Sequence, residues 1–409
     1  MRVIRVRGRD WDRLVQRGFL RRPRVEEKVR RIVEAVRAEG DEALLRYTRR
    51  FDRVKLKARQ LRVTEAETSA AFQNISPEFV ASLKRVIENV ERFHRRSVKR
   101  PWRMRDENGV VLGEQPVPLE RVGVYIPGGT APLVSTVYMT VLPARIAGVK
   151  EILLATPPRP DGSVDPHILV VANPLKVSAV YKMGGAQAIA AFAFGTKTIP
   201  KVDKIVGPGN AYVTEAKRQV YGYVDIDMTA GPTEIAVIAN QHANPEFVAK
   251  DLEAENEHHQ GLAVLITPSK ALARAIQHRV GRGYIIMVRS LAEAAEVANA
   301  LAPEHLEIQV RRPEALVRKI RTAGAIFVGP YSPASVGDYA AGPSHVLPTG
   351  GTGRFFSGLG VGDFMRVTHV IGYTRKALEA DRDMIQRLAT IEGLTRHWES
   401  VQARLDQDE

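Results

Sequence analysis

Between about residue 120 and residue 330, short β-branched runs alternate with glycine-rich turns and helical patterns, and this alternation constrains the fold more than any other feature. The runs that predict buried strands are 151–158, 234–240, 262–267 and 325–329. Segments 178–195 and 203–222 each contain a strand pattern, a glycine turn and a helix pattern. Strands that alternate with helices form parallel sheets with helices on both faces. The sequence therefore predicts an α/β fold.

The two ends of the chain have a different texture, because helical patterns dominate residues 1–100 and 375–409. The clearest expected helices are Val25–Phe51, Glu65–Ile75 and Pro77–His94. The first contains valine and isoleucine at helical spacing with arginine and glutamate between them, which is typical of an amphipathic helix with a solvated charged face.

Length and composition bound the class of protein. A chain of 409 residues exceeds one ordinary core, so two or more domains are expected. No apolar stretch approaches the roughly 20 residues that span a bilayer, and "MRVIRVRGRDW" lacks the apolar segment of a signal peptide. A cytoplasmic protein without a membrane partner is the expectation. The absence of cysteine excludes disulfides, thiolate metal ligands and a thiol nucleophile.

The net charge of +14 raises the hypothesis of a nucleic-acid partner. No aromatic residues are interleaved with the early arginines to stack on bases, and no nucleic-acid motif occurs. We therefore expect no nucleic-acid partner. The alternative, a nucleic-acid binder, predicts salt-sensitive retention of DNA or RNA and no reduction of NAD.

Four glycine-containing loops, "YIPGGTAP", "MGGAQA", "VGPGNA" and "TAGPTE", follow expected strands. Ligands of parallel sheets gather at the loops after strand carboxyl ends. Glycine there lets backbone N–H groups approach a pyrophosphate at a helix N-terminus. Together the loops indicate a dinucleotide or another phosphorylated ligand, although none is a true G-x-G-x-x-G.

Polar clusters supply the chemistry. "AENEHHQG" (254–261) places two histidines behind two glutamates, and "APEHLEIQV" (302–310) places Glu304 beside His305 just ahead of a strand. An adjacent carboxylate and imidazole suit general acid–base catalysis. Asp338 and His345 lie in a segment rich in glycine, proline and serine, 332–353, and "IEGLTRHWES" (391–400) holds two more candidates, Glu392 and His397. The histidine cluster alone would also fit a zinc hydrolase that acts without a nicotinamide.

Seven motifs occur in the order and spacing of one family, over about residues 20–400. They are "VGVYIPGGTAPL", "GGAQAIAAFAFGT", "KIVGPGNAYVTEAKRQV", "DMTAGPTEIAVIA", "PEHLE", "GDYAAGPSHVLPTGGTGRF" and "EGLTRH". On these motifs the chain resembles histidinol dehydrogenase. The resemblance implies two successive NAD-dependent oxidations, of L-histidinol to histidinaldehyde and then to L-histidine, the last steps of histidine biosynthesis.

The resemblance also implies roles for individual residues. Glu304 and His305 match the catalytic pair, with the glutamate suited to activating water and the histidine to accepting protons. Without a cysteine the aldehyde cannot form a thiohemiacetal, so water must attack it. The positions that match NAD contacts are Tyr125, Gln187 and Asn210. The positions that match substrate contacts are Thr233, Glu255, His258, His305, Asp338, His345, Glu392 and His397.

The family's zinc ligands map onto Glu255, His258, Asp338 and His397. The spacing of Glu255 and His258 puts both on one face of a helix, so His258 rather than His259 is the expected ligand. Glu255 stands where the family has glutamine, and the stretch after His258 is shorter than usual. A related zinc- and NAD-dependent dehydrogenase of another small diol, such as a sulfopropanediol, is the alternative.

The implied fold has two incomplete Rossmann-like domains with parallel sheets, plus small N-terminal and C-terminal helical segments. The expected division is an N-terminal segment 1–20, a discontinuous first domain 21–124 and 234–359, an NAD-binding domain 125–233, and a C-terminal segment 360–409. The implied assembly is a homodimer in which the C-terminal segment completes the partner subunit's site.

Overall fold

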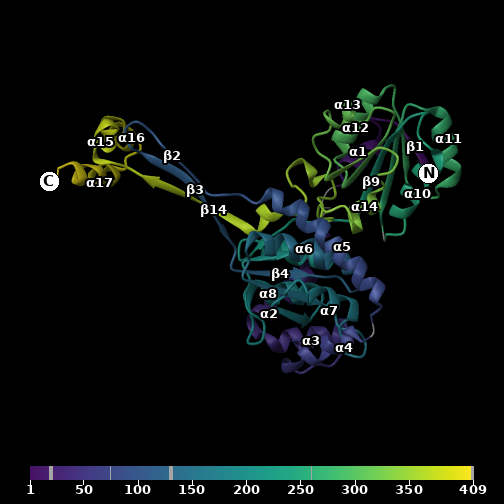
Figure 1. Ribbon diagram of the computed structural model, residues 1–409, viewed down its shortest axis with the longest axis horizontal. Coiled ribbons are helices and arrows are strands. Elements are labelled where there is room, and N and C mark those ends of the chain that lie inside the picture. The colour runs from purple at the N-terminus through teal and green to yellow at the C-terminus, as the bar shows by residue number, and fades with distance from the viewer. Residues whose placement is uncertain (18–21, 74, 129–131, 259, 407–409) are drawn as a thin grey trace. The chain divides into compact units, whose positions relative to one another are not determined.

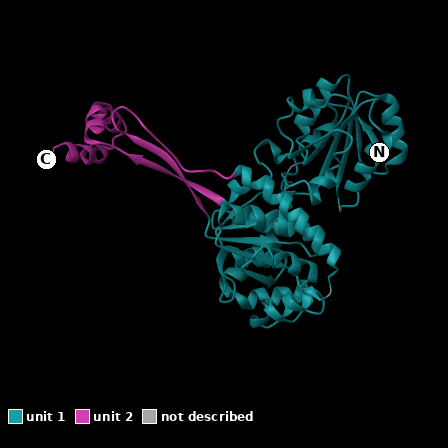
Figure 2. Ribbon diagram, viewed as in Figure 1, with its two compact units in different colours: residues 1–97, 119–364 teal, residues 98–118, 365–409 magenta. Residues whose placement is uncertain are grey.

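The computed structural model describes residues 1–17, 22–73, 75–128, 132–258 and 260–406. His259 and residues 129–131 of the first glycine loop therefore lie outside the described residues. Within the described ranges the strands form sheets of six, five and three strands (Figure 1). The chain divides into two compact units, residues 1–97 with 119–364, and residues 98–118 with 365–409 (Figure 2).

The first unit contains the two larger sheets, and in both of them every strand pair is parallel. The expected α/β class with parallel sheets is confirmed. Among the described residues, no helix has the length and apolar character needed to cross a membrane.

The strands of the six-stranded sheet, in spatial order, are β1 (Arg2–Ile4), β11 (Tyr284–Met287), β10 (Leu262–Thr267), β9 (Glu234–Ala239), β12 (His305–Gln309) and β13 (Ala325–Val328). Helices α1 (Arg9–Val15), α12 (Leu291–Leu301) and α13 (Glu314–Val317) pack on one face. On the other face lie α10 (Pro245–Glu255), α11 (Lys270–Arg279) and α14 (Ala334–Tyr339). Both faces are covered, which explains why the strands read as nearly continuous apolar runs.

The strands of the five-stranded sheet, in spatial order, are β6 (Ala179–Lys182), β5 (Glu151–Thr156), β4 (Arg121–Tyr125), β7 (Lys204–Val206) and β8 (Asp225–Ile226). One core joins this sheet to α2 (Pro23–Glu39), α3 (Asp41–Phe51), α8 (Gly185–Phe194) and α9 (Ala211–Val220). The other helices of this half are α4 (Glu65–Phe72), α5 (Pro77–His94), α6 (Val134–Ala147) and α7 (Pro166–Ala172).

The grouping of the early helices differs from the division expected from the sequence, which joined residues 21–124 to 234–359. The apolar stripe of α2 packs on α8 and α9, so these helices belong with the five-stranded sheet. Small alanine side chains along α8 allow this close approach. The expected helical stretch Val25–Phe51 is two helices, because the chain turns at Gly40, where φ is +59°.

The second unit holds an antiparallel sheet of β14 (Met365–Gly372), β3 (Val111–Pro118) and β2 (Trp102–Arg105). Its helices are α15 (Arg375–Ala380), α16 (Arg382–Ile391) and α17 (Thr395–Leu405). The C-terminal segment, expected to be helical, thus begins with a long strand. That strand pairs along its whole length with β3, about 250 residues earlier in the chain.

A buried ion pair fixes the turn between β7 and α9. The side chains of Lys217 and Asp227 are 3% and 1% exposed and form an ion pair. The Lys217 ammonium also donates to the carbonyl of Gly207 at 3.0 Å, and Asp227 accepts from the N–H of Gly207 at 2.7 Å. Gly207 has φ +115°, and a Cβ there would lie 2.1 Å from the carbonyl oxygen of Tyr125. The turn therefore depends on a glycine and on both charges.

We expect Lys217→Met to lower the free energy of unfolding by about 3–5 kcal/mol, because the Asp227 carboxylate would be left buried without its cation. The double variant Lys217→Met/Asp227→Asn should recover much of the loss, since no isolated charge remains. Denaturant unfolding of the two variants and the wild type measures both effects. Equal loss in the single and double variants would contradict this account.

A second buried polar group lies at the end of α5. His94 is 1% exposed, and neither ring nitrogen has a hydrogen-bond partner among the described residues. Burial lowers the pKa of His94 to about 4. The native protein therefore keeps this imidazole neutral over a pH range in which an unfolded chain would protonate it, near 6.5.

This depressed pKa should make stability fall as the pH drops from about 6.5 toward 4, because the unfolded state then binds a proton that the native state does not. We expect His94→Leu to reduce the slope of unfolding free energy against pH in that window, by up to about 1.4 kcal/mol per pH unit. The matched control His278→Leu replaces an exposed histidine of α11 and should leave the slope unchanged. Identical slopes for wild type and His94→Leu would refute the effect.

Candidate active site

The parallel pairing of β9 with β12 builds the centre of the site. His305 of β12 pairs in register with Ile235 of β9, so both strands begin at the same edge of the sheet. Thr233 immediately precedes β9 and Glu304 immediately precedes β12. The backbone N–H of Glu234 donates to Oε2 of Glu304 at 3.0 Å. The two candidate loops are thereby joined at the amino ends of their strands.

His305 lies between two carboxylates. Its side chain is 7% exposed, with Nδ1 3.8 Å from Oε2 of Glu255 and Nε2 3.9 Å from Oδ1 of Asp338. Glu255 ends α10 and Asp338 lies in α14, so both come from the helices on this face of the sheet. The hydroxyl of Thr233 donates to the other carboxylate oxygen of Glu255. Four of the residues predicted from the sequence are therefore brought together.

The electrostatics of this cluster favour bound protons. The pKa of Glu304 is raised to about 8, chiefly by burial and in part by the charges of Glu255 and Glu234, while the charge of His305 opposes the rise. Burial alone would lower the pKa of His305, but the charges of Glu304, Asp338 and Glu255 prevail and raise it to about 9. The buried pair consequently retains a proton at neutral pH, which suits groups that exchange protons with a ligand.

His345 faces a cavity of about 570 Å³ that it lines together with His305, Asp338 and His94. Its Nδ1 lies 3.1 Å from the backbone carbonyl oxygen of Asp338, and its Nε2 lies 3.1 Å from the hydroxyl of Thr136. Because a carbonyl only accepts, this contact places the proton on Nδ1. Burial lowers the pKa of His345, so the ring stays neutral there.

His94 is a cavity-lining residue that the sequence analysis missed. It follows an ordinary amphipathic pattern at the end of α5, and that pattern does not distinguish it from a core histidine. Only the structure shows that its unpaired ring borders the cavity of His305.

The three predicted coenzyme positions follow strand carboxyl ends of the five-stranded sheet. Tyr125 ends β4, and its hydroxyl accepts from the N–H of Gly185 at 3.0 Å. Gln187 is buried in α8, and both its amide oxygen and its amide nitrogen lack partners in the described part of the chain. Asn210 caps α9, accepting from the N–H groups of Tyr212 and Val213. A buried amide with both atoms unpaired is a group that a bound ligand could satisfy.

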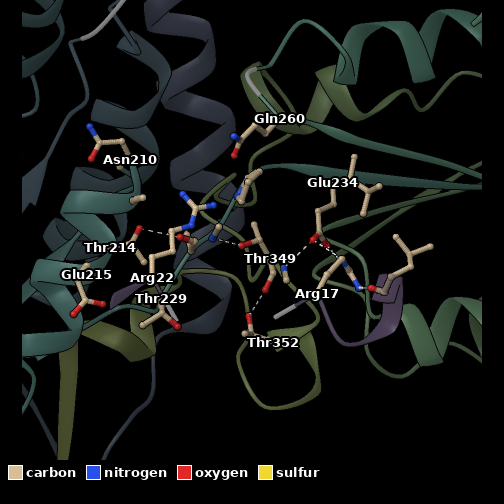
Figure 3. A pocket seen from close by; sticks show the side chains of 18 of the residues that line it. Arg17, Arg22, Asn210, Thr214, Glu215, Thr229, Glu234, Gln260, Thr349 and Thr352 are labelled. Atoms are coloured by element: carbon tan, nitrogen blue, oxygen red, sulfur yellow. Dashed lines mark hydrogen bonds and ion pairs between the residues drawn. The ribbon is translucent and has the colours of Figure 1, made fainter. Parts of the chain in front are cut away.

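A second cavity, of about 830 Å³, is lined by Asn210 and Thr214 of α9, by Glu234 and by Thr349 (Figure 3). At its wall the guanidinium of Arg17 donates through two nitrogens to the Glu234 carboxylate, at 2.7 and 2.5 Å. The sequence offered no signal for this pair, because its members are 217 residues apart.

The remaining predicted residues are placed differently. Helix α10 ends at Glu255, and His258 lies in the following turn with an exposed side chain, its backbone N–H donating to the carbonyl of Glu255 at 3.3 Å. Glu392 caps the end of α16 and His397 lies in α17, both in the second unit. Among the described residues, no group of three or more His, Asp and Glu side chains is arranged to hold a metal ion.

Comparison with known proteins identifies the family. The family model described as histidinol dehydrogenase matches residues 15–405. The histidinol dehydrogenase of Heliobacterium mobile is 45% identical over 99% of this chain and 100% of its own, and that of Moorella thermoacetica is 46% identical over 97% and 98%. The crystal structure of histidinol dehydrogenase from Elizabethkingia anophelis, 36% identical, covers 99% of this chain and 98% of its own with a TM-score of 0.93. The chain therefore belongs to the histidinol dehydrogenase family.

Proposed function

We propose that this protein oxidises L-histidinol with two molecules of NAD, through histidinaldehyde to L-histidine, as a cytoplasmic homodimer in histidine biosynthesis. The observation that carries the proposal is the buried Glu304–His305 pair at the start of β12, with His305 between Glu255 and Asp338. This arrangement supplies proton acceptors at one point, in a chain of the histidinol dehydrogenase family.

The chemistry of the two steps follows from these groups. In the first step the neutral form of His305, which its raised pKa makes the minor form at pH 7, takes the proton of the substrate hydroxyl as a hydride leaves for NAD, which gives the aldehyde. The chain has no cysteine, so water adds to the aldehyde, and Glu304 in its ionised form takes a proton from that water. A second hydride then leaves the hydrate for a second NAD, and the product is a carboxylate. One water and two NAD are consumed for each histidinol.

Tyr125, Gln187 and Asn210 are the proposed NAD contacts. The unpaired amide of Gln187 supports this role, because a bound coenzyme would give hydrogen bonds to a group that is otherwise buried without any. Asn210 uses its amide oxygen to cap α9, which leaves its amide N–H₂ group to donate to a ligand. All three follow strands of one parallel sheet, the usual place for a dinucleotide.

Zinc is the proposed metal, held by Glu255, His258 and Asp338, with His397 supplied by a second copy of the chain. Carboxylate oxygens and imidazole nitrogens are ligands that zinc takes. Glu255 and Asp338 already lie on two sides of one imidazole, which fits the proposed set. Bound there, zinc would supply an anchor for the nitrogen atoms of the substrate.

Thr233, His345 and Glu392 complete the proposed substrate contacts, together with the zinc ligands and His305. Glu255 stands where the resemblance calls for glutamine, and this departure keeps a second candidate activity, the oxidation of another small diol such as a sulfopropanediol. The two candidates differ in which substrate reduces NAD, so one assay separates them.

We expect the wild-type protein supplied with zinc to form two NADH per L-histidinol consumed, because the aldehyde is oxidised at the same site. Spectroscopic counting of NADH against histidinol and histidine measures this ratio, with sulfopropanediol and other diols assayed in parallel. Turnover of a diol and none of histidinol would replace the proposed substrate.

His305→Asn and Glu304→Gln are the matched controls for this assay, since each replaces a group that titrates with an amide that does not, and Glu304→Gln also keeps the size of the side chain. Loss of a general acid–base group typically lowers turnover by about 10²–10⁴-fold. Near-wild-type turnover in both variants, with normal folding and zinc content, would remove the roles assigned here.

We expect a mixture of His397→Ala and His305→Ala subunits to regain activity that neither has alone, because a mixed dimer can hold one site with both residues intact. The measurement is NADH formation after subunit exchange, followed by mass spectrometry of the mixed dimer. Each variant mixed with itself is the control. Verified exchange without rescue would show that His397 serves the chain that carries it.

A further inference from the structure

We propose that Asp251, Glu307 and Gln309 form a polar brace that sets the positions of Glu255 and Asp338 on either side of His305. These three are positioning residues, and the inference rests on the site roles proposed above. Glu307 ends the "PEHLE" motif and Gln309 follows it by two residues, but the sequence analysis assigned no role to any of the three.

The brace connects three elements through hydrogen bonds that are buried or partly buried. Glu307 of β12 is 1% exposed, and its Oε1 accepts from the backbone N–H of Ala334, the first residue of α14, at 2.8 Å. Its Oε2 accepts from the amide nitrogen of Gln309 at 2.9 Å, and the same nitrogen donates to Asp251 of α10 at 2.8 Å. Helix α10, strand β12 and helix α14 are thus tied by side chains on one face of the sheet.

Each tied element carries one member of the His305 cluster at a matching distance along the chain. Glu255 follows Asp251 by four residues in α10, and Asp338 follows Ala334 by four residues in α14. Four helical residues rise about 6 Å. His305 precedes Glu307 by two residues on the same face of β12, which is about 6.6 Å. The brace therefore forms one layer of contacts across α10, β12 and α14, and the His305 cluster forms a second, parallel layer across the same three elements.

The two carboxyl groups of the brace attract rather than repel each other. The pKa of Glu307 is raised to about 8, chiefly by burial and in part by the charge of Asp251. Burial also raises the pKa of Asp251, and a hydrogen bond from Glu307 opposes this. A protonated Glu307 can donate to the Asp251 carboxylate while its other oxygen accepts from Ala334. The pair then links the two helices as a hydrogen-bonded unit.

This geometry predicts unequal effects for two variants. Glu307→Leu removes both links, so both Glu255 and Asp338 should shift relative to His305. Asp251→Ala removes only the link to α10, so the Glu255 carboxylate should shift while Asp338 stays. Glu307→Gln keeps an acceptor for Ala334 and offers an N–H to Asp251. Its N–H₂ group cannot accept from Gln309, but the Gln309 amide can turn so that its oxygen, which has no partner among the described residues, accepts instead. The variant should therefore keep both helices tied.

Crystal structures of the three variants and the wild type give a readout that does not depend on the reaction. We expect the separation of His305 from Glu255 to change by about 1 Å in Asp251→Ala, and both separations to change in Glu307→Leu. Unchanged separations in these two variants would overturn the proposal. If the wild type failed to oxidise histidinol, the proposed function would fail, and these structures would still decide the brace.

Steady-state kinetics test whether the brace affects turnover. A misplacement of about 1 Å can lower turnover by about 100-fold, so Glu307→Leu should lose kcat by 10- to 100-fold with NAD affinity unchanged. Glu307→Gln should stay within about 3-fold of wild type.

The matched control is Ile276→Ala, a fully buried residue of α11 outside the brace, which lowers stability by loss of packing. It should keep its kcat well below its melting temperature. Equal loss of kcat in this control and in Glu307→Leu would show that Glu307→Leu acts only through a general loss of stability. Failure of Glu307→Gln to rescue would contradict the hydrogen-bonding argument.

Discussion

The parallel register of β9 against β12 is the constraint on which the candidate site depends. Five residue pairs, from His305 with Ile235 to Gln309 with Ala239, hold the two strands side by side. Since both strands run in one direction, Thr233 and Glu304 must emerge at the same edge. This is the amino edge of the six-stranded sheet, whereas the five-stranded sheet presents the usual carboxyl edge with Tyr125 and Asn210. The loop 227–233 joins the two sheets, and a single cavity borders both Asn210 and Glu234 (Figure 3).

The candidate site holds several carboxyl groups, so the charge of a further carboxylate at this edge, that of Glu234, has to be neutralised by nearby groups. Glu234 follows Thr233 directly and lies 4% exposed beneath the site. Two parallel hydrogen bonds from Arg17 neutralise it, a geometry that a lysine cannot offer. The N–H of Gly350 also donates to it, at 2.9 Å. With Glu234 paired in this way, its backbone N–H remains oriented toward Glu304, whose own charge is suppressed by burial.

Helices and strands were predicted well, because the sequence patterns that identify them involve only neighbouring residues. Strand β10 and helix α5 have the expected bounds, and β9 and β13 end one residue earlier than expected. Associations over long distances could not be predicted in this way. The apolar stripe of α2 fits either half of the chain until the small residues of α8 are seen against it. Strand β14 pairs along its whole length with a segment about 250 residues earlier in the chain, and no local pattern indicates that partner. The hydrogen bonds to Glu234 and the cavity beside His94 are likewise formed by residues that are far apart in the chain.

Within the candidate site, too, the sequence indicated which residues are neighbours in the chain but not which groups they contact. The adjacency of Glu304 and His305 is visible in the sequence, but consecutive strand residues point to opposite faces. Their partners differ, because Glu304, just before the strand, accepts from the backbone N–H of Glu234, whereas His305, the first strand residue, lies between Glu255 and Asp338. The regular helix expected to carry both Glu255 and His258 ends at Glu255, and a tight turn, in which the N–H of His258 donates to the carbonyl of Glu255, leads to His258. The helix end separates a buried Glu255 from an exposed His258, and the residue spacing alone did not indicate where the helix would end.

The glutamate at position 255 has a physical rationale in its contacts. One carboxylate oxygen of Glu255 accepts the hydroxyl of Thr233, and the other faces His305 at 3.8 Å. A glutamine has one acceptor oxygen, and its second terminal atom is a donor. With glutamine, either Thr233 or the His305 side would face an N–H₂ group. A carboxylate serves both sides at once, and the hydroxyl of Thr233 offsets part of its charge. The substitution therefore keeps an oxygen directed into the cluster while Thr233 fixes the orientation of the group.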